Sequence, residues 1–267
     1  MILVFDIGNT NIKIALFSKE EIIKKWRLPS NPKFSVKKYY SLITKILIGE
    51  KLKDTVIEDA VISSVVPKLT PVIAKTVKKI WNIKALVINT TIYNKLSVTI
   101  PESAINEIGT DLLCDALAAW TKYKKASIIV DFGTALSFTA LDQNGNISGI
   151  AITPGIGTAI KALFQNTAQL PEIPLEIPES SLGKNTIWSI QAGILFGYKG
   201  LIESMINQMK NDLHKEKNTN TDEIVVIATG GLNGILKNKA SFFTNFEDDL
   251  TLHGIKRALK EVRENEN

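Results

Sequence analysis

Two Asp-x-Gly segments are the parts of this chain best suited to chemistry. Residues 6–8 follow an apolar run at 2–5, and residues 131–133 follow another at 128–130. In such a segment the glycine lets backbone N–H groups approach a polyanion closely, and the aspartate offers a hard oxygen to a hydrated Mg²⁺. One such segment could be an ordinary turn, but two in one chain favour phosphate binding. We therefore expect phosphate at both segments and a metal ion at Asp6.

Short polar side chains beside these glycines would add hydrogen-bond donors for a phosphate without adding bulk. Gly8 and Asn9 are also expected to supply the positive φ angles of a hairpin turn. Lys13 could reach a transferring phosphoryl group, although outside this context it would be assigned to the exposed surface of an edge strand. The expected phosphate-binding residues of the two segments are Gly8, Asn9, Thr10, Asn11, Lys13, Gly133 and Thr134.

A third glycine element follows the last clear apolar strand, residues 224–228. It consists of Thr229, Gly230 and Gly231, and a short helix is expected at residues 232–236. Backbone amides at the start of a helix, together with its dipole, favour phosphate. A Gly-Gly turn is common on its own, so it is the order of the three elements that makes Gly230 and Gly231 candidate nucleotide-binding residues.

The elements that must position these residues alternate between strands and helices. Strands are expected at residues 2–6, 12–17, 21–28 and 59–66, and helices at 35–48 and 70–81. This alternation predicts an α/β fold with a mostly parallel sheet. The second half opens in the same way, with strands at 127–131, 136–141 and 147–152, so we expect an internal duplication of about half the chain.

The composition is that of a soluble globular protein. The chain has 267 residues, of which 45% are apolar and 22% charged. No export leader is visible, and the apolar runs fall short of the roughly 18 residues of a membrane span. Cys114 is the only cysteine, which excludes an intramolecular disulfide and is typical of a reducing compartment. We expect a cytoplasmic protein with no membrane partner.

The net charge of +5 raises the question of nucleic-acid binding. The lysines are scattered in pairs, such as Lys24 with Lys25 and Lys78 with Lys79, which is typical of solvated helix faces. No recognition motif accompanies them, so no nucleic-acid partner is expected. A mild positive field equally suits an anionic small molecule.

Several motifs resemble those of type III pantothenate kinases, and the resemblance spans nearly the whole chain. They are residues 5–11 with Lys13, 63–67, 130–135, 153–157, 167–171, the positions Asn185, Thr186, Ser189, Gln191 and Gly193, and residues 250–254. The resemblance implies two ribonuclease-H-like lobes of the actin-like ATPase fold, residues 1–116 and 117–267, each a mixed sheet flanked by helices. It also implies a homodimer.

The same resemblance implies a reaction and its cofactors. ATP would phosphorylate pantothenate to 4′-phosphopantothenate, the first step of coenzyme A biosynthesis. Besides Mg²⁺ at Asp6, a monovalent cation, K⁺ or NH₄⁺, would lie near Asp131. Thr186 would contact the substrate.

The catalytic base implied by the resemblance is Asp111, in the element Gly109-Thr110-Asp111, whose three residues would also bind the substrate. A hydroxyl that attacks a phosphate must lose its proton as the new bond forms, and a carboxylate in line with it can accept that proton. Asp111 precedes an apolar helix expected at residues 112–120, so the alternative role is a helix N-cap.

Two departures from the family pattern concern the acceptor. Leu112 stands where the family usually has arginine, and residues 102–107 lack the usual tyrosine and Asn-Pro pair. Two alternatives to pantothenate phosphorylation therefore stay open. One is a kinase for another small alcohol or sugar, and the other is a non-catalytic nucleotide-binding accessory protein. The retained set of Asp6, Lys13, Asp111 and Asp131 argues against the second.

Overall fold

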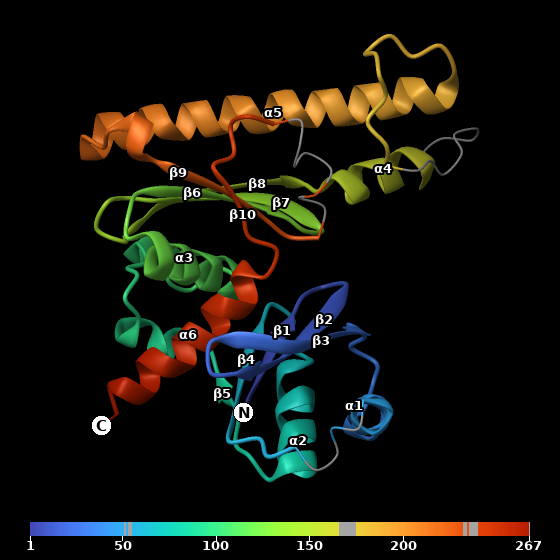
Figure 1. Ribbon diagram of the computed structural model, residues 1–267, viewed down its shortest axis with the longest axis vertical. Helices are drawn as coiled ribbons and strands as arrows, with labels where there is room; N and C mark the ends of the chain where they lie inside the picture. The colour runs from blue at the N-terminus through green and yellow to red at the C-terminus, as the bar shows by residue number, and fades with distance from the viewer. Residues whose placement is uncertain (51, 53–54, 166–174, 232–233, 235–239, 267) are drawn as a thin grey trace. The chain divides into compact units, whose positions relative to one another are not determined.

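The computed structural model describes residues 1–50, 52, 55–165, 175–231, 234 and 240–266 (Figure 1). The motif at residues 167–171 and most of the helix expected at 232–236 lie outside them. The chain forms two compact units, Met1–Ala118 with Thr251–Asn267, and Ala119–Leu250. The first boundary is close to the expected one at 116/117. The expected division put the last helix in the second lobe, whereas most of this helix belongs to the first unit.

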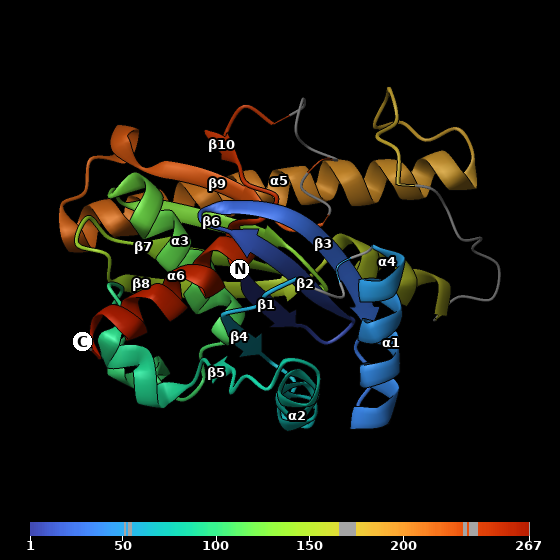
Figure 2. The ribbon, with the colours of Figure 1, turned by 60° about the horizontal axis from the view of Figure 1, so that its bottom comes forward.

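The first unit is built on a five-stranded mixed sheet in the order β3-β2-β1-β4-β5 (Figure 2). β1 pairs antiparallel with β2 and parallel with β4. The strands are β1 Ile2–Ile7, β2 Asn11–Ser18, β3 Glu21–Pro29, β4 Asp59–Ser64 and β5 Leu86–Val87. The helices are α1 Val36–Gly49, α2 Thr70–Trp81, the start of α3 (Thr110–Tyr123), most of α6 (Leu250–Glu264) and 3₁₀ turns at Thr90–Lys95 and Glu102–Ala104.

The second unit is built on another five-stranded mixed sheet, in the order β10-β9-β6-β7-β8. β6 pairs antiparallel with β7 and parallel with β9. The strands are β6 Ser127–Phe132, β7 Ala135–Leu141, β8 Ile147–Pro154, β9 Val225–Thr229 and β10 Asn245–Phe246. The helices are α4 Ile156–Gln165, α5 Thr186–Lys217 and a 3₁₀ turn at Thr221–Glu223.

The two sheets have the same topology, which confirms the predicted duplication. When strands are numbered within each unit, both read 3-2-1-4-5, with strand 2 antiparallel to its neighbours and strands 1, 4 and 5 parallel. Asp6 near the end of β1 therefore corresponds to Asp131 on β6. The fold is the predicted one of two ribonuclease-H-like lobes, and the prediction of a mostly parallel sheet is wrong, because both sheets are mixed.

Alternate residues of β1 face two different helical layers. Leu3, Phe5 and Ile7 pack with Tyr39 of α1 and Ile73 of α2. On the opposite face, the ring of Phe17 on β2 contacts the His253 ring and the Lys256 ammonium, both on α6. Because Asp6 lies between Phe5 and Ile7 in sequence, its side chain is on the face away from α1 and α2.

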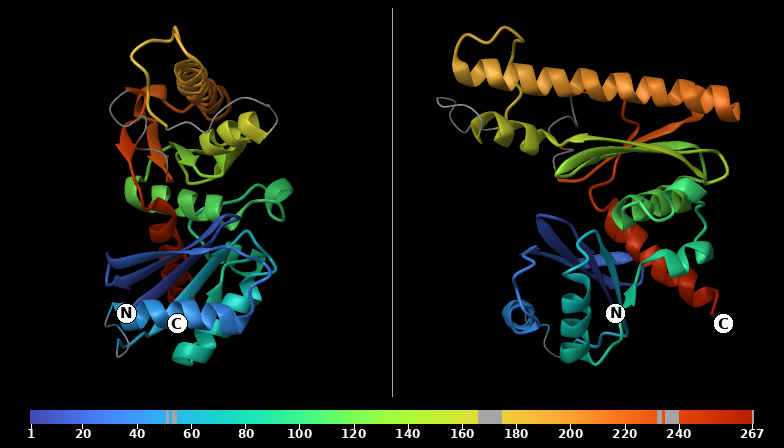
Figure 3. Two further views of the ribbon diagram at one scale, coloured as in Figure 1. Left: turned by 90° about the vertical axis from the view of Figure 1, so that its right-hand side faces the viewer. Right: turned by 180° about the vertical axis from the view of Figure 1, so that it is seen from behind.

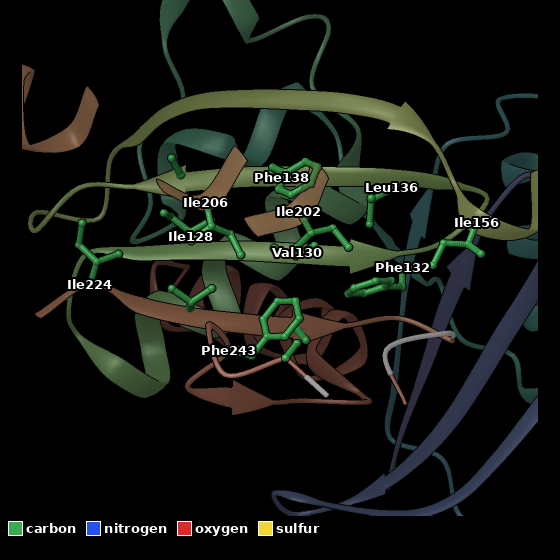
Figure 4. Packing of buried hydrophobic residues seen from close by; sticks show 14 of the residues in the cluster. Ile128, Val130, Phe132, Leu136, Phe138, Ile156, Ile202, Ile206, Ile224 and Phe243 are labelled. Carbon is green, nitrogen blue, oxygen red and sulfur yellow. The ribbon is translucent and has the colours of Figure 1, made fainter. Parts of the chain in front are cut away.

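The second unit buries one face of its sheet under α5, which lies along that sheet (Figure 3). Ile128, Val130 and Phe132 of β6 pack there with Ile202 and Ile206 of α5 (Figure 4). Strand side chains alternate between faces, so Asp131 is on the opposite face from α5. In both units, the residues that flank the aspartate on its strand pack into the core on one face of the sheet, and the aspartate is on the other face.

Candidate active site

Asp6 occupies the middle of a row of polar side chains across three strands of the first unit. It is directly opposite Lys13 on β2 and Ser63 on β4. The Asp6 side chain is buried, and its Oδ2 lies 3.4 Å from the Lys13 ammonium nitrogen. Burial raises the pKa of Asp6, while the positive charge and hydrogen bond of Lys13 oppose that rise. A nearby cation stabilises the ionised form of such a buried carboxylate.

The turn between β1 and β2 leaves polar groups exposed. The Gly8 amide donates to the Asn11 carbonyl oxygen at 3.0 Å, while Asn9 and Thr10 are exposed. The expectation of positive φ at Gly8 and Asn9 is wrong, since neither has it. Gly8 instead provides room: a Cβ there would lie 3.3 Å from the Asn11 oxygen.

Lys13 is held by the sheet. Because β2 lies between β1 and β3, Lys13 is not on an edge strand, and the alternative of an ordinary edge-strand lysine is excluded. Its side chain is about one-third exposed and directed at Asp6. It can therefore reach both the buried carboxylate and a bound anion.

Asp111 lies in the first turn of α3, in the electrostatic field of Asp6 and Lys13. Burial is the main cause that raises the pKa of Asp111, followed by the negative charge of Asp6, and hydrogen bonds from backbone amides and the charge of Lys13 lower it. The Leu112 amide donates to Asp111 Oδ1 at 2.9 Å. Because the charges of Asp6 and Lys13 both act on the Asp111 carboxyl, the expected base is near this pair.

The N-cap alternative for Asp111 does not hold. The Leu113 amide donates to the Gly109 carbonyl oxygen at 3.1 Å, which makes Gly109 the residue that accepts the first helical hydrogen bond. Asp111 is two residues further along, inside the helix. Gly109 also makes room for the base, because a Cβ there would overlap Asp111 Oδ1.

Thr110 directs its hydroxyl at β4. Its Oγ1 and the Ser63 Oγ are 2.8 Å apart, and the Ser64 amide donates to the same Oγ1 at 3.0 Å. The residue is 8% exposed. Two protein groups therefore already bond the Thr110 hydroxyl that was expected to contact the substrate.

Cys114, one helical turn beyond Asp111, is a buried packing residue. Burial and then the negative charges of Asp115, Asp6 and Asp111 raise its pKa well above the usual value. Such a thiol stays protonated near neutral pH and is a poor nucleophile.

In the second unit two glycines allow close backbone approaches at the turn that follows β6. Gly230 has a φ of +90°, and a Cβ there would overlap Asp131 Oδ1 and the Phe132 backbone. A Cβ at Gly155 would overlap the Gly133 and Thr134 carbonyl oxygens. Substitution at Gly155 or Gly230 would therefore displace the turn that follows β6. Gly231 is exposed beside Gly230, with open space around it.

Asp131 also stands in a polar row. Its partners in register are Ser137 on β7 and Thr229 on β9, both buried. The Thr229 hydroxyl oxygen is buried and has no hydrogen-bond partner among the described residues. The row offers oxygen atoms next to a carboxylate, which suits a cation.

Thr186 is the first residue of α5 and is exposed. The helix starts at Thr186, because the Asn185 side chain caps it by accepting from the Trp188 amide at 2.9 Å. Among the described residues, no hydrogen bond or ion pair of Thr186 joins it to the Asp131 row.

Sequence reasoning did not assign three residues that lie beside candidate residues within one unit or the other. They are Ser63, Gly155 and Thr158. Ser63 pairs with Asp6 in register, and Gly155 packs closely against the turn after β6. The Thr158 hydroxyl donates to the Thr134 carbonyl oxygen at 2.6 Å. Ser63 and Gly155 lie within motifs that carry the resemblance. Thr158 has no sequence signal beyond its helical position.

The described residues contain no cluster of three or more histidine, cysteine or acidic side chains that could hold a metal ion. Mg²⁺ needs no such cluster, since one or two carboxylates with phosphate oxygens and water suffice. Among the described helices, none has the length and apolar character to cross a membrane.

Comparison with known proteins identifies the family of this chain. The family model for type III pantothenate kinases matches residues 2–208. Type III pantothenate kinases of Finegoldia magna and Citrifermentans bemidjiense are 36% and 34% identical over 256 residues, which cover 96% of this chain and 95% and 97% of theirs.

A solved structure from Campylobacter jejuni, described as a Baf family transcriptional activator, aligns with a TM-score of 0.58 at 17% identity. The alignment covers 98% of this chain and 99% of that one, and it supports the fold alone. The family match and the two relatives carry the assignment: this chain belongs to the type III pantothenate kinase family.

Proposed function

We propose that this protein transfers the γ-phosphoryl group of ATP to the primary hydroxyl of pantothenate, the reaction that opens coenzyme A biosynthesis. The observation that carries the proposal is the joint placement of Asp6, Lys13 and Asp111 in the first unit of a chain of this family. A carboxylate for a metal, a cation for a phosphate and a second carboxylate for a proton are the groups this reaction needs.

The reaction assigns one role to each group. The pantothenate hydroxyl oxygen bonds to the γ-phosphorus, the bond from that phosphorus to the oxygen bridging to the β-phosphate breaks, and ADP leaves. Asp111 accepts the hydroxyl proton, and the raised pKa of its carboxyl makes it a better acceptor. Lys13 offsets the negative charge of the transferring group.

The residues present fit a magnesium ion bound together with ATP. Asp6 would hold it, because burial disfavours the charge of this carboxylate and a metal ion would stabilise that charge in addition to Lys13. When bound, Mg²⁺ supplies positive charge to the phosphate oxygens. In the first unit, the turn at Gly8–Asn11, whose Asn9 and Thr10 are exposed, would donate to the other phosphate oxygens. In the second unit, the turns at Gly133–Thr134 and Gly230–Gly231 stay predictions of nucleotide binding.

The second unit fits a monovalent cation. Asp131 would supply a carboxylate oxygen, and Thr229, whose buried hydroxyl lacks a described partner, would supply another oxygen. We expect K⁺ or NH₄⁺ to stimulate the enzyme and Na⁺ to do so less. Equal rates in the two salts would count against this assignment.

A homodimer is proposed from the exposed apolar side chains of the second unit. Trp188 is 51% exposed in the first turn of α5, and Ile187 and Phe196 are exposed on the same helix. The start of α3 offers no such apolar surface, because its Leu113, Ala116 and Leu117 are in the core. We further propose that the protein is cytoplasmic, where ATP is available.

Another small alcohol or sugar is the second candidate acceptor. Leu112 is buried, so at this position the chain offers a pantothenate carboxylate no charged partner. The segment 102–107 is largely exposed. A substitute for the missing cation would have to come from elsewhere.

A coupled assay of ADP release decides between the acceptors. Turnover is measured with pantothenate, with a panel of sugars and small alcohols, and with no acceptor. Turnover that depends on pantothenate supports the proposal. Silence with pantothenate and turnover with another alcohol would move the function to the second candidate.

A further inference from the structure

A chain of hydroxyl groups ties the end of β4 to the start of α3. Thr110 Oγ1 is 2.8 Å from Ser63 Oγ and accepts from the Ser64 amide at 3.0 Å. On the other side of Ser64, the hydroxyl of Thr70 on α2 donates to Ser64 Oγ at 2.8 Å. The end of β4 therefore holds two helices. It holds α3 through Thr110 and α2 through Thr70.

The hydrogen bond between Ser63 and Thr110 is buried, so it can fix the position of the start of α3. Ser63 is fully buried and Thr110 is 8% exposed. Removal of one partner in such a place leaves a buried donor or acceptor unsatisfied, which costs more than the hydrogen bond itself contributes. The start of α3 is thus held against β4 in one arrangement.

The link also joins the two carboxylates of the site. Ser63 is opposite Asp6 in the parallel β1/β4 register, and Thr110 precedes Asp111 in the chain. The path Asp6, Ser63, Thr110, Asp111 therefore runs through one sheet row, one hydrogen bond and one peptide bond. The negative charge of Asp6 raises the pKa of Asp111, so the two carboxylates are close enough to interact.

We propose that Thr110 and Ser63 are positioning residues, which hold Asp111 in line for proton transfer and do not bind the substrate. The inference rests on the proposed phosphoryl transfer and assigns Thr110 a role different from the substrate contact that the resemblance implied. A hydroxyl has one donor and two acceptor sites, and Ser63 and Ser64 use two of these three. Misplacement of a catalytic group by about 1 Å can cost on the order of 10²-fold in rate.

Three variants separate positioning from other effects. Thr110→Val keeps the shape and removes the hydroxyl, while Thr110→Ser keeps the hydroxyl. Thr70→Val is the matched control, because it removes a hydroxyl bonded to the same Ser64 from a helix that does not carry Asp111.

We expect Thr110→Val to lower kcat about 10- to 100-fold, with the KM values for ATP and pantothenate little changed. Thr110→Ser should recover most of the rate, and Thr70→Val should keep it. A raised KM for pantothenate with kcat unchanged would instead support substrate contact and overturn the proposal.

A double variant tests whether Thr110 acts through Asp111. If it does, Thr110→Val combined with Asp111→Asn should be no slower than Asp111→Asn alone. Losses that multiply would mean that Thr110 contributes independently, and would overturn the proposal.

Hydrogen exchange of the Leu112 and Leu113 amides tests the link without any acceptor. We expect faster exchange in Thr110→Val and unchanged exchange in Thr70→Val. Equal exchange in Thr110→Val and the parent protein would overturn positioning even if pantothenate is phosphorylated. A parent protein silent on pantothenate would overturn the proposed function alone, and this exchange measurement would still decide the link.

Discussion

Asp6 and Lys13 face each other across the β1/β2 pair, with 3.4 Å between Oδ2 and the ammonium nitrogen. The pair joins a buried carboxylate to a partly exposed cation. It can therefore exist without ligands and still separate when a metal ion takes the carboxylate and a phosphate takes the lysine. This exchange of partners is the basis for the metal dependence expected of the enzyme.

Asp6→Asn should raise the magnesium requirement and lower activity. An amide oxygen keeps the size of the side chain but loses the charge that attracts the ion. The check is a magnesium titration of ATP turnover, and we expect half-maximal activity at a higher magnesium concentration in the variant. Identical titration curves would remove Asp6 as a metal ligand.

The raised pKa of Asp6 predicts a pH-dependent stability in the metal-free protein. A carboxyl whose pKa is raised on folding contributes stability that is fully present below its usual pKa of 3.8 and is lost as pH rises through the folded value. The asparagine of Asp6→Asn cannot ionise. The free energy of unfolding of the variant should therefore increase relative to that of the parent protein as pH rises through that range. Urea unfolding at a series of pH values measures this increase. A constant difference at every pH would contradict it.

Gly254 on α6 is expected to be essential to the packing behind Asp111. A Cβ there would overlap the backbone of Cys114 on α3, so Gly254→Ala must push the two helices apart. We expect a loss of about 1–3 kcal/mol in unfolding free energy, with lower kcat. The control is Gly200→Ala on α5, where a Cβ meets open space and the change should add about 0.5–1 kcal/mol. Equal effects of the two substitutions in thermal or urea unfolding would refute the close packing.

Trp188→Glu should produce a monomer if the exposed apolar residues of α5 form the dimer interface. An acid in the first turn favours the helix itself, so the monomer should stay folded. Asn207→Glu, at an exposed position further along α5, is the control and should sediment like the parent protein. A parent protein that sediments as a monomer at working concentration would rule out the proposed dimer.

Much of the fold could be read from local pattern. The helix predicted at residues 70–81 is α2 to the residue, and the repeated Asp-x-Gly segments predicted the two equivalent sheets. Short-range signals suffice there, since helical periodicity and strand alternation depend only on neighbours. The ends of strands were less certain, and β4 stops at Ser64, two residues earlier than expected.

Long-range placement could not be read in this way. The amphipathic pattern of α6 shows that it packs on something, but not that it packs in the first unit, against Phe17 and Cys114. The hydroxyl link between Ser63 and Thr110 joins residues 47 positions apart, and serine and threonine at such positions are usually unremarkable. For the same reason Asp111 could be placed at the start of a helix from sequence but not beside Asp6.

Replacement of Asp111 by asparagine tests the central claim most directly. Asparagine keeps the size of the side chain and its bond to the Leu112 amide but cannot accept the substrate proton. We predict that Asp111→Asn binds ATP like the parent protein, while phosphoryl transfer to pantothenate falls on the order of 10²–10⁴-fold. An Asp111→Asn protein that phosphorylates pantothenate at the parent rate would contradict the account.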